Sequence, residues 1–277
     1  MNILVTGANG FLGSSIINLL SNHGDFVFFK GTRDTINLYS YNSIEEYIDH
    51  NKIEAVIHCA IAGGSRLKRD GVDEFYQNLL MYENLIKFNN RYKVFINFAS
   101  GAEYDRRYNI TDVNEYNLFD NVPVDYYGLS KNVISKLSVH YSGSVSLRIF
   151  GCFYHNELPT RFIRNSLTHY SNGLPMVIHQ DRYMDFIYLE DLISVVEYFL
   201  REDVLTFKDI NMSYLKKYKL SDIANIINNL TSKKVEIIIN DDINGLDYTG
   251  NGKFLNSLNI KMIGLEGGIE RCYEKIK

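Results

Sequence analysis

Short apolar runs alternate with amphipathic segments along the first 150 residues of the chain. The runs are nearly continuous in apolar residues, which is typical of parallel strands that are buried on both faces. Between them, segments 73–88 and 126–141 carry apolar residues at helical spacing. This alternation predicts an α/β fold with a Rossmann-type, doubly wound parallel sheet. The predicted strands cover residues 2–5, 26–30, 55–59, 94–98 and 145–150.

The segment after the second predicted strand carries a pattern of helix initiation. Ser43 is followed three residues later by Glu46, which is the spacing of a capping box. Ile44, Tyr47 and Ile48 then fall on one helical face. The sequence therefore predicts a helix with Ser43 as its N-cap.

After residue 150 the regular alternation ends. We expect residues 1–150 to form a dinucleotide-binding Rossmann domain, to which 185–205 return. Residues 151–184 and 206–277 are expected to form mainly a smaller C-terminal substrate-binding lobe at the carboxyl edge of the sheet, where such folds bind ligands. In this part we expect strands at 185–189 and 235–239, and helices near 161–170, 190–200, 221–230 and the end of the chain.

The first predicted strand leads directly into TGANGFLG, residues 6–13, with glycines at positions 7, 10 and 13. In a dinucleotide-binding turn, one glycine makes the tight turn, one lets the backbone approach a pyrophosphate, and one lets helix pack on strand. The N-terminus of the next helix then presents free N–H groups to the phosphates. A glycine-rich turn without a ligand is the alternative, but the strand before it and the amphipathic helix after it favour dinucleotide binding.

A tyrosine and a lysine at helical spacing form a candidate acid/base pair in VDYYGLSK, residues 124–131. Tyr127 and Lys131 are four residues apart, so they face the same side of a helix. A tyrosine normally keeps its proton until about pH 10, and a nearby ammonium group lowers that value. The pair is therefore a candidate proton donor and acceptor.

The GxxGxxG spacing resembles the short-chain dehydrogenase/reductase superfamily, and at this chain length its extended branch, the NAD-dependent epimerase/dehydratase family. The resemblance implies activity on nucleotide sugars and a catalytic set of Ser100, Tyr127 and Lys131. Ser100 ends the fourth strand, where its hydroxyl would hydrogen-bond a substrate oxygen, although such a serine is also commonly a cap or turn residue. The cofactor-binding residues that the resemblance implies are Gly7, Asn9, Gly10, Phe11, Leu12, Gly13, Arg33, Asn37, Leu38, Ala60 and Lys131.

The end of the second strand, FVFFKGTRD, bears on the choice of dinucleotide. An acidic residue there would bind the ribose 2′-hydroxyl and favour NAD. In this chain Gly31 stands at that place and Arg33 follows. A guanidinium group is a good partner for a 2′-phosphate, although an ordinary solvated arginine is the alternative. We therefore expect NADP(H).

Several stretches resemble the GDP-fucose synthase family, namely GTRDTINLYS (31–40), IEAVIHCA, FYQNLL (75–80), YGLSK and DFIYLEDL. That family epimerises a 4-keto sugar and then reduces it with NADPH. Its epimerising Cys and His correspond here to Ala102 and Arg161, neither of which exchanges the required proton. Sugar-nucleotide 4,6-dehydratases place an Asp-Glu pair where this chain has Gly101 and Ala102, so the dehydratase acid and base are missing as well.

The expected function is NADPH-dependent reduction of the 4-keto group of a nucleotide-diphosphate (6-deoxy)sugar, without epimerisation, in deoxysugar and polysaccharide biosynthesis. Arg161 and Arg182 are candidates for binding the substrate diphosphate, although Met184 and Gly151 replace an Arg and an Asn that the family often has. One alternative is an NAD-dependent nucleotide-sugar 4-epimerase with the same catalytic set. The other is a dinucleotide-sensing regulator, which the retained tyrosine and lysine argue against.

Composition excludes some classes of partner. The 277 residues carry a net charge of −4, which argues against a nucleic-acid binder. No apolar run reaches the length of a membrane span and no signal peptide is evident, so a cytoplasmic protein is expected. Three scattered cysteines, Cys59, Cys152 and Cys272, fit a reducing compartment.

No metal site is expected, because the histidines at 155, 169 and 179 show no ligand spacing. The pair Asp241–Asp242 is predicted to be a solvated turn. The resemblance further implies a homodimer formed through the helices predicted at 73–88 and 126–141.

Overall fold

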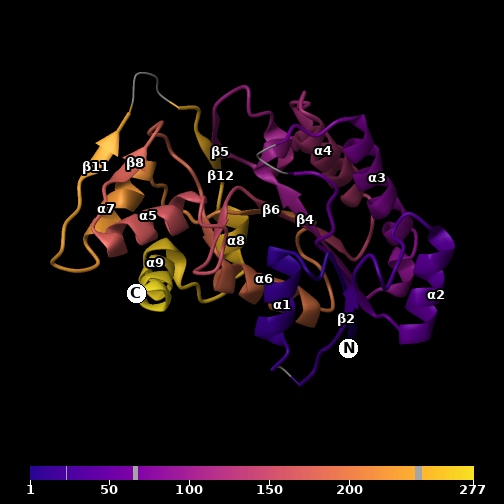
Figure 1. Ribbon diagram of the computed structural model, residues 1–277. Coiled ribbons are helices and arrows are strands. Elements are labelled where there is room, and N and C mark those ends of the chain that lie inside the picture. The colour runs from indigo at the N-terminus through magenta and orange to yellow at the C-terminus, as the bar shows by residue number, and fades with distance from the viewer. Residues whose placement is uncertain (23, 65–67, 241–244) are drawn as a thin grey trace. The chain divides into compact units, whose positions relative to one another are not determined.

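The computed structural model describes residues 1–22, 24–64, 68–240 and 245–277 (Figure 1). The pair Asp241–Asp242 lies outside the described residues. By its internal contacts the chain divides into two units. The first unit comprises Met1–Asp105, Tyr116–Arg148 and Ile193–Ile210, and the second comprises Arg106–Glu115, Ile149–Leu192 and Asn211–Lys277. The assignment of cofactor to one part of the chain and substrate to the other stays a prediction.

A six-stranded sheet in the order β10-β6-β4-β3-β1-β2 forms the centre of the first unit. β1 pairs in parallel with both β2 and β3, and β3 pairs in parallel with β4. Thr6, the last residue of β1, is in register with Gly31 of β2 and His58 of β3, so the three strands end at one edge. The strands are β1 Asn2–Thr6, β2 Val27–Gly31, β3 Ala55–His58, β4 Val94–Ser100, β6 Ser144–Ile149 and β10 Asp209–Met212.

Helices cover both faces of this sheet, which confirms the expected α/β, doubly wound Rossmann-type fold. Ile44, Met81 and Ile134, from α2, α3 and α4, pack into one core with Leu4 and Val56 of the sheet. α1 lies on the opposite face (Figure 1). The inner strands β1, β3 and β4 are therefore buried on both sides, which is the reason for their apolar runs, whereas the edge strand β2 is partly exposed. The helices are α1 Phe11–Leu20, α2 Tyr41–Asn51, α3 Val72–Ile86, α4 Tyr126–Ser138 and α6 Leu189–Arg201, with 3-10 turns η1 Asn89–Arg91, η2 Gly101–Tyr104 and η3 Glu115–Phe119.

The predicted start of α2 was wrong. The helix begins at Tyr41, and its N-cap is Ser40, whose side chain accepts a hydrogen bond from the backbone N–H of Ser43. The hydroxyl of Ser43 instead accepts from the N–H of Asn37 at 3.1 Å. An earlier serine thus takes the capping role, and the Ser43–Glu46 spacing falls inside the helix.

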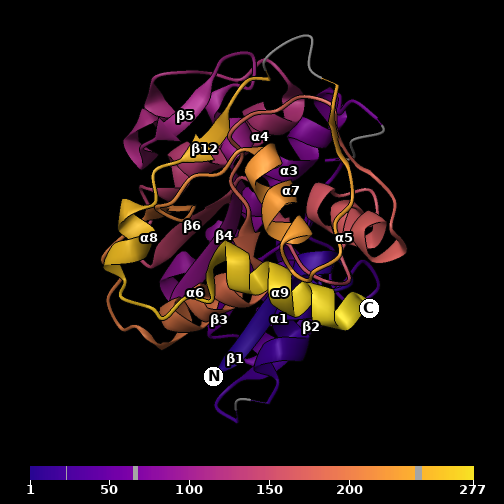
Figure 2. The ribbon, with the colours of Figure 1, turned by 90° about the vertical axis from the view of Figure 1, so that its left-hand side faces the viewer.

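The second unit contains short parallel strand pairs and a cluster of helices. β8 pairs with β11, β5 with β12, and β7 with β9. Because β5 pairs with β12, residues Arg106–Glu115 belong to this unit although they lie between β4 and α4 in sequence. Figure 2 shows α5, α7 and α9 together, and Leu167, Ile223 and Ile269 of these helices share one core. The elements are β5 Ile110–Val113, β7 Cys152–Phe153, α5 Phe162–Asn172, β8 Met176–Ile178, β9 Ile187–Tyr188, α7 Leu220–Asn228, β11 Ile237–Ile239, β12 Tyr248–Gly250, α8 Lys253–Ser257 and α9 Gly264–Ile276.

Candidate active site

Two of the three glycines in the turn after β1 occupy positions that a side chain cannot share. Gly7 has a φ of +64°, and an ideal Cβ there would lie 2.8 Å from the backbone nitrogen of Ala60. A Cβ on Gly13 would lie 2.5 Å from the carbonyl oxygen of Gly7. The first glycine thus permits the left-handed turn and its close approach to the end of β3, and the third permits α1 to pack on the turn.

The N-terminus of α1 is open to an anion. Its N-cap is Gly10, which offers no side-chain acceptor, and the first turn of the helix contains no acidic residue. The N–H of Gly10 is used by the carbonyl of Gly7 at 2.9 Å, but the N–H groups of the first turn that follow have no capping side chain. Asn9 is exposed, and Phe11 and Leu12 are half-buried. Uncapped N–H groups at the positive end of the helix dipole suit a pyrophosphate.

The end of β2 is tightly packed around Gly31. A Cβ on Gly31 would lie 3.0 Å from Leu4 Cδ1 and 3.2 Å from backbone atoms of β1. Arg33 is exposed and makes no hydrogen bond or ion pair with the described part of the chain. Asn37 is exposed and its side-chain oxygen accepts from the N–H of Tyr39, whereas the side chain of Leu38 lies in the core. Among Gly31, Arg33, Asn37 and Leu38, only Arg33 therefore carries a charge, and this charge has no partner among the described residues.

Ser100 is the last residue of β4 and the N-cap of the turn η2. Its hydroxyl oxygen accepts a hydrogen bond from the backbone N–H of Ala102 at 3.2 Å. A hydroxyl oxygen that accepts in this way still carries a hydrogen of its own to donate. The cap role therefore orients the side chain and leaves the donor that the catalytic role requires.

A close backbone contact brings the tyrosine-bearing helix to the turn after Ser100. An ideal Cβ on Gly128 would lie 2.6 Å from the carbonyl oxygen of Ala102, so no larger residue fits between α4 and η2. Tyr127 directly precedes this glycine, and its ring edge lies 3.3 Å from the Cβ position of Gly64 in the loop after β3. The tyrosine, the serine turn and the β3 loop thus meet at the edge where the glycine turn also lies.

Lys131 lies one helical turn after Tyr127 and is almost fully buried. Its ammonium group donates a hydrogen bond to the carbonyl oxygen of Phe98 on β4 at 2.7 Å. Burial lowers the pKa of Lys131, and the negative charges of Glu103 and of Cys59, when ionised, act in the opposite direction. An ammonium group has three donors, so two remain beyond the bond to Phe98.

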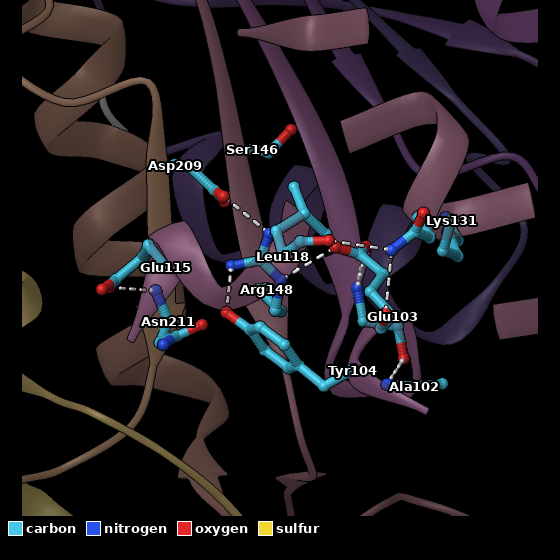
Figure 3. A network of polar contacts seen from close by, with 12 residues as sticks. Ala102, Glu103, Tyr104, Glu115, Leu118, Lys131, Ser146, Arg148, Asp209 and Asn211 are labelled. Carbon is cyan, nitrogen blue, oxygen red and sulfur yellow. Dashed lines mark hydrogen bonds and ion pairs between the residues drawn. The ribbon is translucent and has the colours of Figure 1, made fainter. Parts of the chain in front are cut away.

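A buried ion-pair network next to Ser100 was not predicted from the sequence (Figure 3). Glu103 is fully buried, and its carboxylate accepts from Arg148 Nε at 2.8 Å. Arg148 also donates to the hydroxyl of Tyr104 at 2.9 Å and to the carboxylate of Asp209 at 2.6 Å. Burial raises the pKa of both carboxyl groups, and the charge of Arg148 opposes that shift. The S-x-x-E spacing from Ser100 to Glu103 was the one sequence signal that could have revealed part of it.

The two arginines expected at the substrate both belong to the second unit. Arg161 is the exposed N-cap of α5. Arg182 donates from one terminal nitrogen to the carbonyl of Leu246 at 3.2 Å, and its Nε is buried without a hydrogen-bond partner in the described residues. Their role toward a diphosphate stays a prediction.

The structure explains one departure from the related families. An ideal Cβ on Gly151 would lie 2.8 Å from both the carbonyl oxygen of Asp185 and a ring carbon of Phe186. An asparagine would not fit there, so that family contact to substrate has no counterpart at this position. Met184, at the other substituted position, packs against the core of the second unit.

No helix within the described residues is both long and apolar enough to cross a membrane. They contain no cluster of three or more His, Cys, Asp or Glu that could hold a metal ion. A hollow of about 520 Å³ along α9, lined by residues between Lys261 and Glu274, contains none of the predicted site residues.

The glycine turn after β1 and the residues Ser100, Tyr127 and Lys131 near the same sheet edge are the features expected of an extended short-chain dehydrogenase/reductase. The chain belongs to the NAD dependent epimerase/dehydratase family, whose match covers residues 3–213. The resemblance noted from the sequence is thereby confirmed. The family contains enzymes of several reaction types, so membership alone leaves the reaction open.

Known relatives of the chain cover these different reactions. The trifunctional UDP-glucose 4,6-dehydratase/UDP-4-keto-6-deoxy-D-glucose 3,5-epimerase/UDP-4-keto-L-rhamnose-reductase of Arabidopsis thaliana is 21% identical over 305 residues. That match covers 95% of this chain, which spans only 44% of the length of that relative.

Two solved structures share the fold of the chain. The GDP-mannoheptose C4 reductase from Campylobacter jejuni with NADP bound has a TM-score of 0.82 at 18% identity, covering 99% of this chain and 97% of the other. The UDP-glucose 4-epimerase from Thermotoga maritima with UDP-glucose has a TM-score of 0.79 at 16% identity, covering 99% and 98%. Because a reductase and an epimerase fit about equally well, the residues of the site must distinguish them.

Proposed function

We propose that this protein is an NADPH-dependent reductase of the 4-keto group of a nucleotide-diphosphate (6-deoxy)sugar, and that it reduces without epimerising. The observation that carries the proposal is the loop after Ser100. In the turn η2, Gly101–Tyr104, Gly101 and Ala102 have no acid or base, and the one carboxylate of the turn, Glu103, is fully buried and paired with Arg148. The turn therefore offers no free carboxylate to remove a proton from the carbon next to the ketone, whereas the proposed reduction needs only Ser100, Tyr127 and Lys131.

Each residue of the catalytic set has a separate task. NADPH supplies the hydride when it is bound. The Ser100 hydroxyl donates a hydrogen bond to the ketone oxygen, where negative charge develops. The Tyr127 hydroxyl delivers its proton to that oxygen. Lys131 uses its remaining N–H donors for the nicotinamide ribose and favours the deprotonated form of the tyrosine by its charge.

The preference for NADP(H) is supported at the end of β2. The position where an acidic residue would favour NAD is occupied by Gly31, and a Cβ there would be tightly placed, 3.2 Å from the backbone of β1. Arg33, two residues on, is exposed and has no partner among the described residues. A guanidinium group in that place is suited to a 2′-phosphate.

Arg161 and Arg182 are assigned to the substrate diphosphate. The buried Nε of Arg182, which has no partner among the described residues, supports this assignment, because an unsatisfied buried donor is costly unless a ligand or water accepts from it. A panel of nucleotide-linked ketosugars identifies the sugar and the nucleotide base of the substrate.

A cytoplasmic homodimer formed through α3 and α4 completes the proposal. Its support is a set of large apolar side chains that these two helices leave exposed, namely Val72, Tyr76, Tyr126 and Leu137. Sedimentation analysis of the purified chain measures the oligomeric state directly.

A nucleotide-sugar 4-epimerase that uses NAD is the second candidate. The similarity of the fold to a UDP-glucose 4-epimerase supports it, and such an enzyme could use the same Ser100, Tyr127 and Lys131. Tightly bound NAD in the purified protein would favour this candidate.

The deciding experiment measures NADPH oxidation with a panel of nucleotide-linked 4-keto-6-deoxy sugars, with NADH in parallel. We expect rapid loss of reduced-nicotinamide absorbance with NADPH and one of the sugars. Tyr127→Phe should lower turnover by about 10²- to 10⁴-fold, because it removes the proton donor. Tyr126→Phe, one residue earlier, is the matched control and should keep turnover. No oxidation with any ketone, together with C4 exchange of an ordinary nucleotide hexose, would establish the epimerase instead.

A further inference from the structure

The carboxylate of Glu103 bonds to the backbone of the proposed catalytic serine. One carboxylate oxygen accepts from the backbone N–H of Ser100 at 2.9 Å, and the other accepts from Arg148 Nε at 2.8 Å. The Ser100 hydroxyl in turn accepts from the N–H of Ala102. Backbone and side chain of the serine are thus held by two different bonds, and the backbone bond depends on Glu103.

The position of Glu103 is itself determined by charged partners. Arg148 is fully buried, and its terminal nitrogens are occupied by Tyr104 and Asp209, so the guanidinium group has one orientation (Figure 3). A carboxylate paired with it has no water to turn toward, because the side chains of both partners are 0% exposed. A charge-assisted bond of this kind holds a backbone N–H more firmly than a neutral acceptor does.

The same turn is tied to the helix that carries the other two catalytic residues. The side-chain amide of Asn132 donates to the backbone carbonyl of Glu103 at 2.9 Å. Asn132 directly follows Lys131 in α4 and is buried. Glu103 therefore lies between the serine and the tyrosine–lysine helix, bonded to both by separate groups.

We propose that Glu103 is a positioning residue for Ser100: held by Arg148, its carboxylate fixes the backbone N–H of Ser100 and so places the serine hydroxyl against the substrate oxygen. This inference rests on the proposed function, in which Ser100 contacts that oxygen. Glu103 is placed here away from the substrate, so it acts through the residues that it contacts. The proposal assigns its main effect to the bond with the Ser100 N–H rather than to its charge near Lys131.

A double-mutant cycle tests this dependence. Glu103→Gln keeps an acceptor for the Ser100 N–H and the size of the side chain, but it turns an amide donor or a neutral oxygen toward Arg148. We expect it to lower kcat by roughly 10- to 100-fold, because a misplacement of a catalytic group by about 1 Å can cost about 100-fold, and to leave the Kd for NADPH unchanged. In a Ser100→Ala background the same substitution should change kcat by less than about twofold, because coupled residues are not additive. Glu83→Gln, in the exposed pair with Lys87, is the matched control and should change nothing.

Two results would overturn the inference. A full, multiplicative loss of kcat in the Ser100→Ala background would show that Glu103 acts independently of the serine. A loss of NADPH affinity and thermal stability that accounts for the fall in activity would show a purely structural role.

Failure of the proposed function is recognised separately, from the wild-type protein. If the wild-type protein epimerises C4 instead of reducing ketones, the double-mutant cycle of Glu103 and Ser100 is measured on the epimerisation. Ser100 would contact the C4 oxygen in that reaction as well. If the protein catalyses neither reaction, the proposed function fails, and the amide resonance of Ser100 tests the bond. An upfield shift of that proton in Glu103→Gln supports the carboxylate contact, and an unchanged shift contradicts it.

Discussion

Replacement of Arg148 by methionine should strongly destabilise the protein. The arginine side chain is 0% exposed and pairs with Glu103, which is also 0% exposed, and with Asp209, which is 11% exposed. It also donates to the hydroxyl of Tyr104. Methionine fills much of the same space, but two buried carboxylates then lose their common counter-charge.

The size of the effect follows from this burial. Removing one partner of a buried ion pair typically lowers the free energy of unfolding by about 3–5 kcal/mol, because the remaining charge is buried without compensation. We expect Arg148→Met to fall in that range or to be obtained only partly folded. The matched control is Arg201→Met. Arg201 also pairs with two carboxylates, Asp25 and Glu197, but its side chain is 45% exposed, so its loss should cost less than about 1 kcal/mol.

The pH dependence gives a second, independent signature. Burial raises the pKa of Glu103 and of Asp209, and removal of Arg148 should raise both further. A carboxyl group whose pKa is higher in the folded than in the unfolded state stabilises the fold at a pH below its unfolded-state pKa. That contribution to stability is lost as the pH rises through the folded-state pKa. The deficit of Arg148→Met should therefore be largest near neutral pH and shrink as the pH falls toward about 4 to 5.

Urea unfolding without added dinucleotide, followed by circular dichroism at several pH values, measures both effects. Dinucleotide is left out because a bound ligand would add its own stabilisation. Equal losses for Arg148→Met and Arg201→Met would refute the view that burial decides the cost. A deficit that stays constant from pH 8 to pH 5 would refute the assignment of that cost to unpaired carboxylates.

Three further substitutions test the geometry of the site. Gly7→Ala should weaken NADPH binding, measured by fluorescence, by at least roughly tenfold, because the φ of +64° and the 2.8 Å from a Cβ to the backbone are incompatible with a side chain. Gly24→Ala should leave NADPH binding unchanged, because nothing lies within 4 Å of a Cβ there. Arg33→Ala should weaken NADPH binding by about tenfold or more and leave NADH binding unchanged in calorimetry, since only NADPH carries the 2′-phosphate; an equal loss for both would contradict the 2′-phosphate contact. Gly128→Ala should lower kcat by roughly 100-fold, because a Cβ 2.6 Å from the carbonyl of Ala102 must displace α4 from the serine turn; unchanged kcat would show that this contact does not place the catalytic residues.

Local patterns in the sequence predicted the parts of the fold that depend on neighbours along the chain. The apolar runs predicted the strands at nearly their observed bounds, because strands buried on both faces are mostly apolar. The glycines at 7 and 13 were assigned correctly to a turn that excludes side chains, and the tyrosine and lysine at 127 and 131 lie one turn apart on the expected helix.

Such local patterns did not predict hydrogen bonds that depend on a residue outside the pattern. Ser43–Glu46 and Ser100–Glu103 have the same spacing, yet only the second pair forms a capping box. Ser43 fails because Ser40 already caps that helix, whereas Glu103 bonds to Ser100 while its other oxygen bonds to Arg148, 45 residues away.

The sequence by itself therefore determined the class of fold, the dinucleotide turn and the candidate catalytic residues, because these follow from hydrophobic periodicity and short spacings. Only the tertiary structure decided that Arg106–Glu115 joins the second unit, that Gly31 is tightly packed against β1, and that the carboxylate of Glu103 forms an ion pair. Each of these features depends on contacts between residues that are far apart in the sequence, and no local sequence pattern encodes such contacts. The ion pair of Glu103 matters most for the proposed function, because a free carboxylate at that place would have offered the base that the proposed reductase does without.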